Sequence, residues 1–218
     1  QLWAVPLLGE DAMIDNGDAA NSVGFRVRRL RLGFEGALMK NVVLELTLDP
    51  THGDELIHDA SISWKANPMA WLSFGTGKVP YSRTVLESSS QLRFVDRPFS
   101  TGDVAMGHRL GVTLEGRFWG GALGYVGGVY NGSEGMAQGN ASGGLLYGGR
   151  LESLPLGPLA TMRSDEFRFQ LGGGAVVEDG PTIDTFAWSG DMHVETGGLR
   201  ARFEYLYDKR TPKTMPQV

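Results

Sequence analysis

The sequence of 218 residues contains no cysteine, so disulfides and thiolate metal sites are excluded. It has no basic excess, because 20 Lys and Arg against 25 Asp and Glu give a net charge of −5, which argues against nucleic acid as the main partner. It has no run of 18 apolar residues, so no transmembrane helix is expected. The opening QLWAVPLLGED lacks the basic and long apolar regions of a signal peptide, so it is expected to be a mature end or a fragment boundary.

Glycine, by contrast, is abundant, with 32 residues, about twice the usual share, which disfavours helix and suits sheets with tight turns. Apolar and polar residues alternate over successive segments separated by Gly, Asn, Asp and Pro. In KNVVLELTLD at residues 40–49, Val42, Leu44, Leu46 and Leu48 share one face. Similar segments, starting with FRVRRLRLGFEG, predict about ten antiparallel strands and an all-β fold.

One long segment, residues 80–107, carries no alternation. A loop of this length inside a compact β-protein is usually functional or disordered, and Ser82 to Phe94 is expected to form a short helix. The predicted organisation is an irregular segment at 1–21, strands over 22–209 with this loop between them, and an irregular tail or the start of further strands at 210–218.

The alternating strands allow two interpretations. In a soluble sandwich or small barrel the apolar faces point inward, whereas in an antiparallel transmembrane β-barrel they face lipid and the charged faces line a wet lumen. The pattern favours the membrane barrel. Aromatic residues near strand ends fit interfacial belts, and also an ordinary core. They are Trp64, Trp71, Phe118, Tyr130, Tyr205 and Tyr207.

Specific motifs support the barrel. FGTGKVPYSRTVLESSSQLRFVDR at residues 74–97 follows the strand DASISWK, and FRVRRLRLGFEG precedes both. The strands HRLGVTLEG and LGYVGGVYNG come next. In this order the motifs resemble the phosphate- and polyphosphate-selective porin family of the Gram-negative outer membrane, over roughly residues 22–152. The resemblance implies a barrel of about sixteen strands, usually trimeric, that passes anions such as phosphate by passive diffusion past an inward loop.

The resemblance and the polar faces of the strands also suggest residues that line the pore or bind anions. These are Arg29, Arg31, Lys78, Arg83, Arg93, Arg97, Arg109, Arg117, Arg150 and Arg168. By position, the inward loop is expected at about residues 80–107. Charges on a lumen wall either pair into networks that shape the pore or, where a cationic excess is unpaired at a constriction, select ions. Both roles remain open for these arginines.

Three features differ from the family pattern. The chain has about ten strands, it ends in TPKTMPQV without a terminal aromatic residue, and its polar faces mix acids and bases nearly evenly. An incomplete larger barrel or a smaller divergent one is therefore expected. The alternatives to a porin are a non-conducting barrel serving as a structural component of an envelope complex, and a soluble all-β binding module.

No catalytic site, metal site or cofactor is expected. HGDELIH at residues 52–58 lacks the adjacent His and Glu of a metalloprotease helix, and no G-x-S-x-G elbow accompanies His108 or His193. DNGD at residues 15–18 does not have the spacing of an EF-hand. The expected partners are outer-membrane lipid, small anions, and further copies of the chain or other envelope proteins. The expected location is the bacterial outer membrane.

Overall fold

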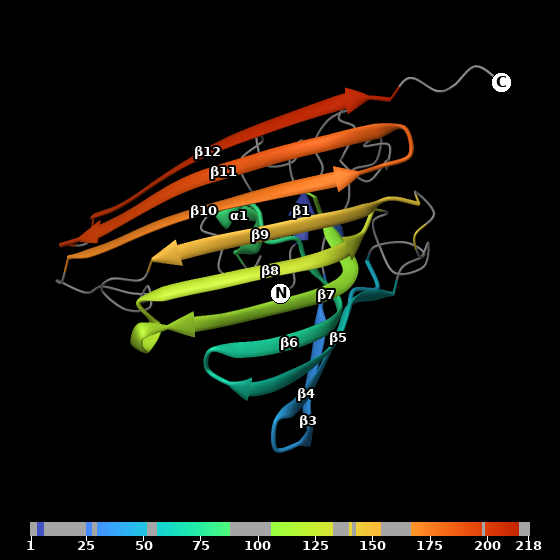
Figure 1. The fold of residues 1–218 in the computed structure, drawn as a ribbon. Helices are drawn as coiled ribbons and strands as arrows, with labels where there is room; N and C mark the ends of the chain where they lie inside the picture. Colours follow the sequence, from blue (N-terminus) through green and yellow to red (C-terminus); the bar gives the residue numbers. More distant parts are fainter. Residues whose placement is uncertain are drawn as a thin grey trace.

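The computed structural model describes residues 4–6, 25–27, 30–51, 56–87, 106–132, 140, 143–153, 167–197 and 199–213 (Figure 1). Ten strands form the main sheet. They are β3 (Leu32–Met39), β4 (Val42–Leu48), β5 (Ile57–Asn67), β6 (Ala70–Lys78), β7 (His108–Phe118), β8 (Leu123–Asn131), β9 (Leu145–Ser153), β10 (Arg168–Asp179), β11 (Ile183–Thr196) and β12 (Leu199–Pro212). A helical turn, α1 (Arg83–Leu86), and a 3-10 turn, η1 (Trp119–Gly121), complete the main body.

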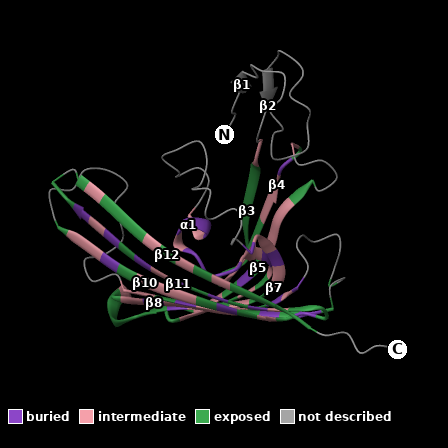
Figure 2. Cartoon of the chain, turned by 90° about the horizontal axis from the view of Figure 1, so that it is seen from above, coloured by how far each residue is buried: buried purple, intermediate pink, exposed green. Residues whose placement is uncertain are grey.

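Each strand of the main sheet pairs antiparallel with the next strand in the chain, so the order runs from β12 to β3 without a crossover. No ladder joins β3 to β12 among the described residues, and the sheet is an open, curved trough (Figure 2). This confirms the predicted fold class: an all-β chain of about ten antiparallel strands, of the kind that forms a barrel wall. No helix in the described part of the chain is long and apolar enough to cross a membrane.

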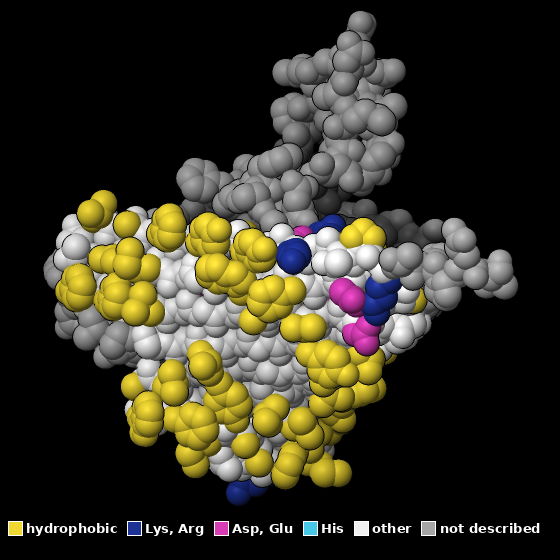
Figure 3. Space-filling model, turned by 45° about the horizontal axis from the view of Figure 1, so that its top comes forward, with side chains coloured by type: hydrophobic (Ala, Val, Ile, Leu, Met, Phe, Trp, Pro, Cys, Tyr) yellow, Lys and Arg dark blue, Asp and Glu magenta, His cyan; other side chains and the backbone are white. Residues whose placement is uncertain are grey.

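The convex face of the sheet is apolar and exposed. Phe74, Leu151 and Phe203 are 57%, 59% and 62% exposed, and apolar side chains cover much of this face (Figure 3). Strand alternation produces it, because every second residue of each strand points to the same side. An apolar surface of this extent is unfavourable in water and suits contact with lipid.

The buried core lies on the other, concave face. Val79 and Tyr81, which follow β6, pack there against Tyr130, Leu146 and Val176. This core is small and local, so most of the fold is held by the hydrogen-bonded ladders between neighbouring strands rather than by a central apolar interior.

The first predicted strand was wrong as a continuous element. Within FRVRRLRLGFEG the chain forms β2 (Phe25–Val27), paired with β1 (Ala4–Pro6) in a separate two-stranded sheet, and joins the main sheet only at Leu32. Periodicity leaves the register of this run open, since a bulge at residues 28–29 would turn Arg26 and Arg28 toward the lumen and an unbroken strand would turn them outward, and it does not determine which strand the segment pairs with.

Six aromatic residues were expected on the apolar face of the strands, and two of them lie on the concave, polar face instead. Trp71 lines a cavity on the concave side. Tyr130 is buried there, with its hydroxyl 3.0 Å from the Thr113 hydroxyl. Both positions follow from alternation, because Leu72 and Val129, their neighbours in sequence, face outward and are exposed.

Candidate functional site

A segment that follows β6 crosses the concave face of the sheet. It comprises residues 79–87, which we call the crossing segment, and it contains α1 (Figure 2). The Tyr81 hydroxyl lies 3.2 Å from the carbonyl oxygen of Trp188 and 3.0 Å from that of Tyr207, and the Ser189 hydroxyl donates to the Tyr81 carbonyl at 2.6 Å. These contacts bind the start of the crossing segment to β11 and β12. Residues 88–105 of the predicted loop lie outside the described residues.

A carboxylate from a distant strand of the wall binds the N-terminal end of the helical turn α1. Glu204 of β12 accepts hydrogen bonds from the backbone N–H groups of Arg83 at 2.7 Å and Thr84 at 3.2 Å, and also from the Thr84 hydroxyl. The Ser82 side chain caps the same turn by accepting from the N–H of Val85 at 3.2 Å. The first N–H groups of a helix have no partner within it, so the wall supplies what the sequence of α1 leaves unsatisfied.

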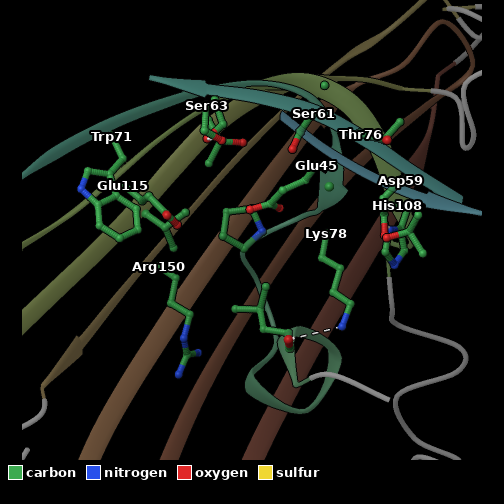
Figure 4. Close-up of a pocket in the computed structure, with 18 of the residues that line it drawn as sticks. Glu45, Asp59, Ser61, Ser63, Trp71, Thr76, Lys78, His108, Glu115 and Arg150 are labelled. Atoms are coloured by element: carbon green, nitrogen blue, oxygen red, sulfur yellow. Dashed lines mark hydrogen bonds and ion pairs between the residues drawn. The ribbon is translucent and has the colours of Figure 1, made fainter. Parts of the chain in front are cut away.

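Basic side chains also connect the crossing segment to the wall. Arg83 pairs with Glu152 at 3.0 Å, and Arg202 pairs with Glu87 at 2.7 Å. The Lys78 ammonium donates to the carbonyl oxygen of Glu87 at 2.8 Å (Figure 4). Each end of α1 is therefore tied to the sheet, and the segment occupies part of the concave, water-facing side.

Beside the crossing segment lies a cavity of about 860 Å³, which we call the wall cavity. It is bounded mainly by the concave face of β3 to β7 and by the crossing segment, and Figure 4 shows side chains of both signs pointing into it. Of the described residues, five basic ones line it, against four acidic ones. The basic residues are Arg31, Lys65, Lys78, Arg83 and Arg150, and the acidic ones are Glu45, Asp59, Glu115 and Glu152.

Several predicted site residues form ion pairs within the wall. Arg31 pairs with Asp49 at 3.2 Å. Arg150 pairs with Asp191 at 2.5 Å, and these side chains are only 1% and 2% exposed. Arg31 and Arg150 therefore take part in pairs of the kind that one of the two open roles requires, and their role in anion binding stays a prediction.

The remaining predicted residues are spread along the strands. Arg109 is buried and donates to the carbonyl oxygen of Met106 at 2.8 Å, where the chain returns into β7. Arg117 is exposed near the other end of β7 and lines a second, smaller cavity. Arg168 is the first residue of β10 and is half-buried. Three predicted site residues lie outside the described residues: Arg29, Arg93 and Arg97.

One cation of the wall cavity was missed in the selection from sequence. The Lys65 ammonium lies 4.7 Å from the centre of the Trp71 ring, an arrangement in which the aromatic face attracts the cation. The signal was present, because Lys65 shares the polar face of β5 with Asp59, Ser61 and Ser63. Lys65 is also the last residue of the strand DASISWK, but the resemblance assigns no role to it.

An antiparallel meander with an apolar convex face, a charged concave face and a segment folded across the concave side has the features of a porin wall. The family model described as phosphate-selective porin O and P matches residues 10–166, more than half of the chain. The chain therefore belongs to this family of Gram-negative outer-membrane channels, which is not a class of enzymes. No curated protein matches the sequence.

Proposed function

We propose that this chain acts in the bacterial outer membrane as a channel that passes small anions such as phosphate by passive diffusion. The observation that carries the proposal is the crossing segment, which is bound to the concave face beside the wall cavity. A segment held on the water-facing side narrows the passage, and the charges around it then act on solutes at short range. No chemical step is involved, because the solute only moves through the lumen.

The number of charges around the wall cavity gives only weak support for anion preference, and their positions give more. Bases exceed acids by one, and several of them are compensated by neighbouring carboxylates. Lys65 lies over an aromatic ring, where its ammonium stays close to the cavity. Arg93 and Arg97 belong by sequence to the same connection between β6 and β7, outside the described residues, and are proposed as two further candidate cations.

Recording from single channels in a planar bilayer tests the proposal. The wild-type protein is expected to conduct, with a reversal potential in a salt gradient that shows preference for anions. Replacing Lys65 by Gln, or both Arg93 and Arg97 by Ala, is expected to shift the reversal potential toward cation preference. The control is Lys40→Gln, since Lys40 lies in the turn between β3 and β4 and does not line the wall cavity. Absence of conductance contradicts the channel, and conductance without a shift contradicts the assignment of these cations.

The pairing of arginines in the wall favours one alternative, a non-conducting barrel that serves as a structural component of an envelope complex. Paired charges such as Arg150 and Asp191 rigidify a wall without attracting ions. The same recordings separate the two functions.

The expected assembly into trimers stays a prediction, which cross-linking of the purified protein in detergent checks. The soluble binding module is disfavoured by the exposed apolar face of the sheet.

A further inference from the structure

Two histidines and an aspartate from β5 and β7 meet beside the wall cavity. Each of His58, Asp59 and His108 offers one ligand atom, and these atoms lie within 4.8 Å of one another. His108 Nδ1 is 2.5 Å from one carboxylate oxygen of Asp59, and His58 Nε2 is 3.9 Å from the other. We propose that these three side chains bind one transition-metal ion, such as Zn²⁺, on the inner wall of the channel.

A bulge in β5 brings two of the three ligands to the same side. Thr47 of β4 pairs with Asp59, but the next residue, Leu48, pairs with Ile57, so His58 is an extra residue in the ladder. Successive residues of a strand normally point to opposite faces, and a bulge of this kind redirects one of them. The rings of His58 and His108 accordingly lie 4.5 Å apart between their centres.

The third ligand comes from the far end of the connection between β6 and β7. His108 is the first residue of β7 and pairs with Lys78 across the ladder, while the Lys78 ammonium is directed to the crossing segment (Figure 4). Figure 4 also shows Asp59 and His108 side by side. The site therefore joins β5 to the point where the chain returns to the wall, and both Asp59 and His108 line the wall cavity.

The donor atoms suit zinc and its neighbours among the transition metals, which bind imidazole nitrogen together with carboxylate oxygen. A tetrahedral ion with bonds of about 2.0–2.1 Å separates its ligand atoms by about 3.3 Å. One ligand atom from each of the three residues lies within 4.8 Å of the other two, so movements of about 1 Å by the side chains bring these atoms to that separation. Three protein ligands leave a fourth position for water from the cavity.

The charged neighbours are compatible with a bound cation. Arg31 also lines the wall cavity, and its guanidinium pairs with Asp49, which is fully buried and also accepts from the N–H of Thr51 at 3.1 Å. The guanidinium of Arg31, the residue before β3, is thus paired with a carboxylate. A bound divalent ion adds positive charge to the same wall that the proposed anions pass.

Calorimetric titration of the metal-free full chain in detergent with ZnCl₂ tests the inference. One ion per chain is expected for the wild type. His58→Gln, Asp59→Asn and His108→Gln are each expected to weaken zinc affinity at least about tenfold, since loss of an outer-shell partner alone costs that much. The control is His193→Gln, because His193 of β11 is a buried histidine outside the cluster, and its zinc affinity should match the wild type.

Heat-modifiable migration on a gel shows which variants are folded. If a histidine variant fails to fold, Asp59→Asn still tests the site, because asparagine has nearly the same shape as aspartate. No zinc uptake by the folded wild type overturns the proposal, as does equal affinity in the wild type and the folded cluster variants. An equal loss in His193→Gln overturns it too, because binding would then be unspecific. Binding is measured without conductance, so failure of the proposed channel function leaves this test intact.

Discussion

Replacing Glu204 by alanine is expected to detach α1 from the channel wall while leaving the rest of the sheet folded. The carboxylate accepts from the N–H groups of Arg83 and Thr84 and from the Thr84 hydroxyl. Other contacts hold the start of the crossing segment, including the Tyr81 hydroxyl on the carbonyls of β11 and β12. The expected result is therefore local opening of α1 rather than unfolding.

The size of the effect follows from the two backbone donors that lose their acceptor. A buried N–H without a partner costs about 1–3 kcal/mol. Glu204 is only half-buried, so water partly replaces it and the lower end applies, about 1 kcal/mol for each donor. The sum of about 2 kcal/mol corresponds to a roughly 30-fold rise in the population in which α1 is detached.

Trypsin cleavage after Arg83 reports this population, because the bond lies inside α1 and is protected while the turn is bound. Where opening and closing are fast, the cleavage rate is proportional to the open population, so about 30-fold faster cleavage is expected. Glu195→Ala is the matched control, since Glu195 lies on the concave face and pairs with Arg200 of the wall at 2.6 Å. Equal cleavage rates in Glu204→Ala, the control and the wild type would refute the reasoning.

Two further substitutions test the wall itself. Arg150→Met leaves the Asp191 carboxylate buried without its 2.5 Å partner, so a loss of about 3–5 kcal/mol in unfolding free energy is expected from urea titration. Adding Asp191→Asn should recover part of that loss, and no recovery contradicts the pairing. Gly75→Ala places a Cβ atom 2.2 Å from the Ala60 carbonyl oxygen at a φ of 144°, and should lower stability by at least about 2 kcal/mol. Gly77→Ala meets nothing within 4 Å and should change little.

The faces of the strands could be predicted from the sequence because alternation is a local property. Val42, Leu44 and Leu46 share a face for any strand that contains them, whatever lies beside it. The exception in FRVRRLRLGFEG shows the limit of this reasoning. There the alternation does not show which strand the segment pairs with: β2 pairs with β1, and the chain enters the main sheet at Leu32.

The candidate site could be predicted only as a region. The motif around Lys78 placed a loop after β6, but the contacts that hold it come from strands far along the chain, with Arg83 and Glu204 separated by 121 positions. The cluster of His58, Asp59 and His108 was not expected, because no spacing motif joins residues 50 positions apart. A bulge that adds one residue to β5 created it, and bulges depend on the register of the neighbouring strand.

The sequence by itself determined that this protein is an all-β wall with one apolar and one charged face, since strand periodicity and turn residues act over a few positions. Only the tertiary structure decided which charges are paired and which face the cavity. Ion pairs such as Arg150 with Asp191 depend on the register of several ladders together. The charges that a permeating ion meets are thus set by pairing between strands, which no single segment of the chain contains.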